Sequence, residues 1–87
     1  MDTFQAIAHP ARRWLLEVLA DGDRTAGELV AGLPNLSQPS ISRHLRILRE
    51  AGLVTVSADA QRRRYALCVT RLVHIDMWIN RLTRNDA

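Results

Sequence analysis

The stretch that decides the fold is Ser37–Ala51, which reads Ser-Gln-Pro-Ser-Ile-Ser-Arg-His-Leu-Arg-Ile-Leu-Arg-Glu-Ala. Ser37 suits a helix N-cap, because its hydroxyl can accept an N–H of the first turn. Pro39 falls within that turn, where no intrahelical N–H is lost. Gly52 follows, where a helix end favours positive φ. The pattern predicts one amphipathic helix, whose apolar stripe consists of Ile41, Leu45 and Leu48.

The face of this helix opposite the stripe is small, hydroxyl-bearing and cationic, with its donors near the N-terminus. Such a face is typical of a helix that enters a DNA major groove N-terminal end first. A solvated helix face is the simpler alternative. Gln38 either reads adenine through its amide or assists the cap. We expect DNA contacts from Gln38, Ser40, Ser42, Arg43 and Arg46.

Length and composition limit the remaining choices. Eighty-seven residues make one small domain, residues 1–87, and 47 % hydrophobic residues exclude a disordered tail. The apolar runs are too short to cross a bilayer, and the N-terminus lacks a signal-peptide pattern. The single cysteine, Cys68, excludes an internal disulfide and suits a reducing compartment. We therefore expect a cytoplasmic protein without a membrane partner.

Positive charge is concentrated in the second half of the chain. Residues 1–42 hold three arginines and five acids, whereas residues 43–71 hold seven arginines and two acids. All twelve basic residues are arginine, and the planar guanidinium suits phosphates and guanine edges. A codon bias towards arginine is the other explanation.

Two helices are expected before the central stretch, over residues 3–8 and from Pro10 to about Gly22. Thr25 and Glu28 then form a capping-box pattern that opens a third helix, which ends by Gly32. Because only a short turn separates this helix from the next, residues 25–51 predict a helix-turn-helix.

After Gly52 the apolar period changes to that of strands, which predicts a hairpin, or wing, over residues 53–68. Residues 53–57 and 62–68 are its expected strands, with residues 58–61 as the turn. Arg62 and Arg64 share one face, whereas Arg63 shares the other with Tyr65. Arg62 and Arg64 are therefore the better candidates for phosphate or minor-groove contact. The alternative is an edge strand protected by charge.

A last helix is expected over residues 70–84, with Thr70 as its cap. Its apolar face is larger than a small core needs, so a second copy of the chain would cover it. Residues 1–20 and 70–84 are the expected dimerisation helices. The candidate interface residues are Phe4, Ile7, Leu72, Ile75, Trp78, Ile79 and Leu82.

These elements define a mainly α protein with a small β-hairpin (α+β), a winged helix-turn-helix with four helices, two strands and a fifth helix. The chain resembles the ArsR family of winged helix-turn-helix repressors, and most of all the branch of SdpR-type autorepressors. The resemblance spans Phe4 to Leu67 and is carried by residues 4–13, 25–28, 37–54 and 63–67. It implies a homodimeric repressor that binds an inverted-repeat DNA operator, paired through its first and last helices.

Three features depart from the family pattern. His9 stands where the family usually has an Asp or Ser cap, the wing turn lacks glycine, and the metal-binding cysteine pair of many relatives is absent. His74 and Asp76 resemble part of a metal site found in some relatives, but the ligand set is incomplete. We expect no metal and no cofactor, and no effector site is visible.

The remaining titratable residues suggest no catalysis. His44 lies beside the apolar stripe, which favours a hydrogen-bonded residue at the edge of the core. No nucleophile–base constellation or phosphate loop is present, so we expect no enzymatic activity. The alternative to a DNA-binding regulator is a winged-helix module for protein–protein interaction, in which the face with Ser42, Arg43 and Arg46 would be apolar or acidic.

Overall fold

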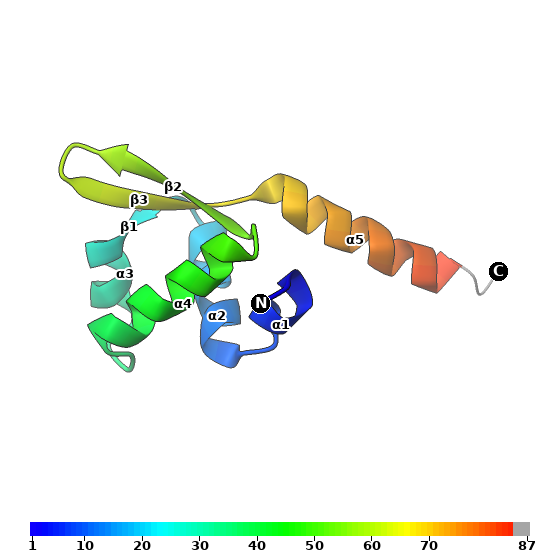
Figure 1. The fold of residues 1–87 in the computed structure, drawn as a ribbon, viewed down its shortest axis with the longest axis horizontal. Helices are drawn as coiled ribbons and strands as arrows, with labels where there is room; N and C mark the ends of the chain where they lie inside the picture. Colours follow the sequence, from blue (N-terminus) through cyan, green and yellow to red (C-terminus); the bar gives the residue numbers. More distant parts are fainter. Residues whose placement is uncertain (85–87) are drawn as a thin grey trace.

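The computed structural model describes residues 1–84 and has the predicted winged-helix architecture, with four helices, the wing and a fifth helix (Figure 1). In chain order the elements are α1 (Thr3–Ile7), α2 (Pro10–Ala20), β1 (Arg24–Thr25), α3 (Ala26–Gly32), α4 (Gln38–Glu50), β2 (Val54–Asp59), β3 (Arg62–Leu67) and α5 (Val69–Thr83). No helix within residues 1–84 has the length and apolar character needed to cross a membrane.

Side-chain caps fix where the first four helices begin. Asp2 accepts the Gln5 N–H, and Thr25 accepts the Glu28 N–H; in both pairs the later side chain accepts the N–H of the cap residue in return. The hydrogen bonds from Thr25 hold the pKa of the Glu28 carboxyl below its usual value. Ser37 caps α4 as predicted, through Ser40 N–H at 3.2 Å. The chain therefore encodes its helix starts locally.

The end of α4 is equally local. Gly52 has φ of 79°, and the N–H groups of Gly52 and Leu53 donate to the carbonyls of Arg49 and Leu48. This is a Schellman arrangement, and it confirms the helix end with positive φ that was predicted at Gly52. The reversal turns the chain directly from α4 into β2.

The core lies where α2, α3 and α4 meet the inner face of the sheet. Leu15 of α2, Leu29 of α3 and Tyr65 of β3 close over the apolar stripe of α4. That stripe is almost fully buried, which confirms the predicted inward face: Ile41, Leu45 and Leu48 are each no more than 1 % exposed. The cationic side of α4 consequently points outward.

The wing differs from the predicted hairpin in two ways. It is a three-stranded antiparallel sheet in the order β1-β3-β2, because the two residues of β1 pair with Tyr65 and Arg64. The expected four-residue turn is also wrong, since the strands continue to Asp59 and from Arg62, leaving Ala60 and Gln61 as the turn. Ala60 takes a left-handed φ of 57°, a conformation that usually favours glycine.

α5 extends from the end of β3 as an arm, away from the compact body (Figure 1). Its N-cap is Cys68, without a side-chain cap bond, so Thr70 does not cap it as predicted. None of the described residues of α5 is buried, although Leu72 and Ile75 lie half-buried against the core. The arm gives the chain its length, 51 Å against 26 and 23 Å in the other directions.

Candidate nucleic-acid interface

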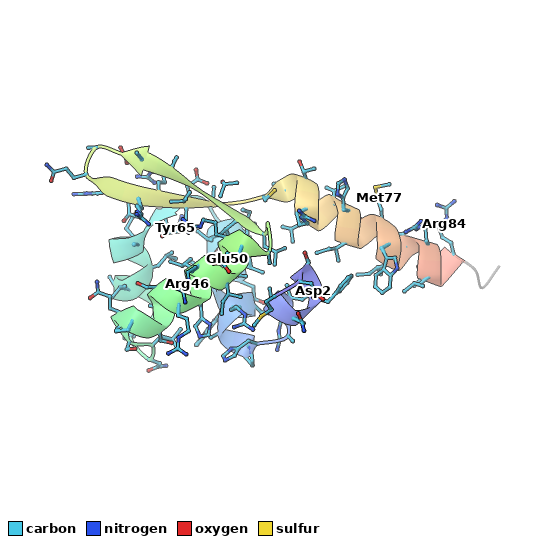
Figure 2. All side chains as sticks on the ribbon, viewed as in Figure 1. Asp2, Arg46, Glu50, Tyr65, Met77 and Arg84 are labelled. Atoms are coloured by element: carbon cyan, nitrogen blue, oxygen red, sulfur yellow. The ribbon has the colours of Figure 1, made fainter. Side chains whose placement is uncertain are left out.

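α4, here called the reading helix, presents three arginines on its outer side. Arg43, Arg46 and Arg49 recur every three residues and all are exposed. Figure 2 labels Arg46 on α4 and Tyr65 at the neighbouring sheet. Between the helix and the wing lies a groove, here called the arginine groove, lined by Ala26, Pro39, Ser42, Arg43, Leu45, Arg46, Arg49, Arg63 and Tyr65.

The register of the wing assigns its three arginines to different faces. Arg63 lies opposite Ala58 and on the same face as Tyr65, so its side chain reaches the arginine groove. Arg64 lies on the other face, where its guanidinium donates twice to Asp59, at 3.0 and 3.2 Å. Arg62 is exposed beside the turn and lines a shallow hollow with the start of α3. Arg63 thus joins the reading helix, whereas Arg62 and Arg64 do not.

The first turn of the reading helix holds the other predicted contacts. Gln38 and Ser42 are exposed and line a hollow between α3 and α4 with Gly27 and Val30. Ser40 is half-buried, and its N–H is taken by the cap. No acidic residue occurs in this turn, so its free N–H groups and positive dipole end remain available to an anion.

Among residues 1–84, all the charged side chains that line the arginine groove are positive. Arg43, Arg46, Arg49 and Arg63 line it, and no carboxylate does. Over residues 1–84 the only ion pair is Arg64–Asp59, which lies on the opposite face of the sheet. Clustered guanidinium groups repel one another, and a polyanion placed among them relieves that repulsion. The geometry therefore suits phosphates and the acceptor-rich edge of guanine.

Beneath the reading helix, on its inner side, lies a polar cluster. Arg12 of α2 is 7 % exposed and donates to Ala6 O at 2.6 Å, Gln5 O at 3.3 Å and His44 Nδ1 at 3.3 Å. His44 is buried at the edge of the core, as predicted, and burial lowers its pKa, with His9, Arg12 and Arg43 lowering it further. His9 Nδ1 caps α2 by accepting the Ala11 N–H, so it replaces the usual Asp or Ser.

The predicted dimer residues form a partly exposed apolar surface over α1 and α5. The Phe4 ring meets the Trp78 ring edge-on, with centroids 5.2 Å apart. Phe4, Trp78, Ile79 and Leu82 are between 42 and 53 % exposed, whereas Ile7, Leu72 and Ile75 also pack against the core. In residues 1–84 no three His, Cys, Asp or Glu side chains gather in a way that would hold a metal ion.

Two arginines of the arginine groove, Arg49 and Arg63, were not among the predicted DNA contacts. Arg49 follows Arg46 at the spacing that joined Arg46 to Arg43, so helical periodicity alone could have identified it. The sequence favours Arg62 and Arg64 over Arg63, because Arg63 shares a face with the apolar Tyr65. The structure shows that this face turns towards the groove near the tip, where the core has ended.

The fold and this groove define a winged helix-turn-helix protein. Residues 9–56 match the family described as bacterial regulatory protein, arsR family, and the chain belongs to that family. The family consists of DNA-binding transcriptional regulators, which are not enzymes.

Known relatives agree in sequence and in structure. The chain is 37 % identical over 86 residues to the transcriptional repressor SdpR of Bacillus subtilis, covering 98 % of this chain and 94 % of that one. It spans a smaller share, 63 %, of the regulator Rv0081 of Mycobacterium tuberculosis, at 33 % identity. The ArsR-like transcriptional regulator from Rhodococcus sp. RHA1 superposes with a TM-score of 0.86 at 27 % identity, over 94 % of this chain and 74 % of that one. HlyU from Vibrio cholerae gives 0.74 at 35 %, over 91 % and 85 %.

Proposed function

We propose that this regulator is a homodimeric transcriptional repressor that binds an inverted-repeat operator in double-stranded DNA. The similarity to SdpR, whose name describes a transcriptional repressor, supports the direction of regulation. Bacterial operators lie on the genome, so the proposed site of action is the cytoplasm. No effector ligand is assigned.

The observation that carries the proposal is the outer face of the reading helix. Ser42, Arg43 and Arg46 project from a helix whose opposite side is fully buried, so the core holds the donors in a fixed orientation. Side chains from rigid elements read bases better than side chains from loops. We propose that Gln38 and Ser40, at the N-terminal end of this helix, and Arg43 contact the base edges or the DNA backbone beside them.

Contacts to DNA phosphates are proposed for Arg49 and for the three arginines of the wing. Arg49 lines the arginine groove from the reading helix and Arg63 lines it from the wing, while Arg62 lies next to the wing turn. Arg64 is retained as a weaker contact, because its guanidinium must first leave Asp59. Such contacts set the position of the protein on the duplex without reading the sequence.

The dimer is proposed to form through the exposed apolar surface of α1 and α5. Pairing that surface with its own copy across a two-fold axis covers Phe4, Trp78, Ile79 and Leu82. Two reading helices related by that axis meet successive major grooves when they lie about 34–36 Å apart, one turn of DNA. An inverted repeat is the DNA sequence that matches this symmetry.

The test is selection of bound fragments from a genomic library, followed by titration of the selected duplex with variants. Arg43→Ala is expected to lose about 1–3 kcal/mol of binding free energy, together with discrimination at one base pair. Arg84→Ala is the control, because it removes the same charge from the far end of α5, distant from the reading helix (Figure 2). Equal affinity of Arg43→Ala and the parent for the selected duplex would refute the assigned face. Failure to enrich any duplex would refute the proposed function and favour a protein-interaction module.

A further inference from the structure

The buried Arg12 connects α1 to the reading helix. Its Nε and Nη2 donate to the carbonyl oxygens of Ala6 and Gln5, which lie at the end of α1, and its Nη1 donates to His44 in the middle of α4. A fourth nearby acceptor is the Met1 sulfur, 3.6 Å from Nη2. One fixed guanidinium therefore ties the helix of the proposed dimer interface to the helix of the proposed DNA interface.

The hydrogen bond between Arg12 and His44 fixes the protonation state of the imidazole. Arginine can only donate, so His44 Nδ1 must accept, and its ring is neutral with the proton on Nε2. A proton on Nδ1 would remove this acceptor and place a second cation 3.3 Å from a guanidinium that stays charged at all relevant pH values.

Every charged or titratable group around His44 acts against its protonation. At the start of α2, the ring of the cap residue His9 lies with its centroid 4.6 Å from that of His44, and Arg12 Nη1 lies 3.3 Å from His44 Nδ1. From α4 itself, Arg43 is the preceding residue. α1 and the residues before it contribute the Met1 sulfur and the carbonyl oxygens that already accept from Arg12. No carboxylate contributes to the shift of His44, and its pKa is lowered, first by burial.

We propose that Arg12 is a positioning residue for the reading helix and that it works only while His44 is neutral, so that mild acid loosens α4 from α1 and α2 and weakens operator binding. The inference rests on the proposed DNA-binding function. Since Arg43 directly precedes His44 in α4, any displacement at His44 moves a proposed base-reading side chain.

The sign of this effect distinguishes it from ordinary electrostatics. Protonating histidines makes a basic protein more cationic, which strengthens its attraction to DNA phosphates. Here acid is expected to weaken binding. Because the pKa of His44 is lowered in the folded state, the unfolded chain takes up the proton first. The stabilising contribution is therefore complete above the ordinary value of 6.5 and declines as the pH falls below it, towards the lowered pKa.

The experiment compares the affinity for the selected duplex between about pH 7.5 and about pH 5.5, where an unperturbed histidine changes charge. The parent protein is expected to lose affinity towards the acid end of this range, by up to roughly tenfold per protomer for each pH unit below the lowered pKa of His44. His44→Asn keeps an acceptor near the position of Nδ1 but does not titrate, so its affinity is expected not to fall. His74→Asn, at an exposed position on α5, is the control and is expected to keep the fall.

Titration of His44 by NMR in the DNA-free parent protein tests the role of His44 directly, without DNA and without variants. A pKa below 6.5 for His44, with unfolding temperatures that drop over the same pH range, is expected. A His44 that titrates at or above 6.5, or a parent affinity that is constant or rises in acid, would overturn the proposal. If no duplex is retained even at about pH 7.5, the proposed function fails, whereas the titration and the unfolding profile still decide the role of the cluster.

Discussion

The reading helix α4 and the arm α5 have similar apolar spacing but opposite surroundings. Ile41, Leu45 and Leu48 of α4 lie in the core, at most 1 % exposed, whereas α5 buries none of its described residues. α4 is enclosed by α1, α2, α3 and β2, while α5 meets the body through Leu72 and Ile75 and, further along, through the contact of Trp78 with Phe4. Periodicity thus predicts which side of a helix is apolar, and the tertiary structure decides whether that side meets the same chain.

This contrast assigns one task to each helix. The core orients α4 rigidly, so its outer face can read DNA, whereas the uncovered side of α5 is the surface proposed for a second copy. The Phe4–Trp78 contact extends that surface onto α1, and Arg12 connects α1 with α4. The two proposed interfaces are therefore joined through a few buried contacts.

The largest expected effect is the difference in stability between two leucine-to-alanine variants, one in α4 and one in α5. Leu48→Ala removes a side chain with 0 % exposure, so it should lower the free energy of unfolding by about 2–5 kcal/mol. Leu82→Ala acts on a side chain that is 53 % exposed and should cost less than about 0.5 kcal/mol in the monomer. Urea unfolding at a concentration where both variants are monomeric provides the measurement. Similar losses would mean that α5 packs on its own body.

A smaller effect is expected on the salt dependence of DNA binding when arginines of the wing are removed. These variants test whether the DNA-binding face extends from the body into the wing. Arg63→Ala and Arg62→Ala should each make the log–log salt dependence of DNA binding shallower by about 0.9, the value for one lost phosphate contact. Arg64→Ala should change it less, because Asp59 already neutralises that guanidinium. The three variants serve as controls for one another, being adjacent on β3. An unchanged slope for Arg63→Ala would remove the wing side of the arginine groove from the interface.

The smallest effect is expected at the wing tip. Ala60 holds a φ of 57°, which costs a residue with a Cβ about 1–2 kcal/mol relative to ordinary conformations. Ala60→Gly removes this strain but adds freedom to the unfolded chain, so a net gain in stability of up to about 1 kcal/mol is expected. Thermal unfolding at constant pH and salt measures it. A loss of stability would show that the turn adopts another conformation.

Most of the fold could be predicted because its signals are local. The capping box at Thr25, the cap at Ser37 and the reversal at Gly52 each use residues within a few positions, and all three were predicted. The additional strand β1 could not be predicted. Its two residues, Arg24 and Thr25, are too few to show the alternation typical of a strand, and their partners in β3 lie about forty positions away. Thr70 was the predicted N-cap because its hydroxyl could accept a first-turn N–H, but α5 begins at Val69 and its N-cap is Cys68.

The candidate site was predictable to the extent that it lies on one helix. Ser42, Arg43 and Arg46 follow from the period of α4. The contribution of Arg63 depends on how the hairpin leans over that helix, which no local pattern encodes. The Arg12–His44 contact likewise joins residues 32 positions apart, and a lone buried arginine gives no sequence signal.

The assignment of α5 to the dimer and α4 to DNA is tested most directly by the oligomeric state of Ile79→Glu and its affinity for the selected duplex. Ile79 is 45 % exposed on α5, so the monomer should tolerate the glutamate, whereas the paired surface would bury it without a partner charge. We predict that sedimentation shows a dimer for the parent and a folded monomer for the variant, with operator affinity collapsing because each half-site loses its tethered neighbour. A variant that remains dimeric and holds the operator as tightly as the parent would contradict the assignment of α5 to the dimer.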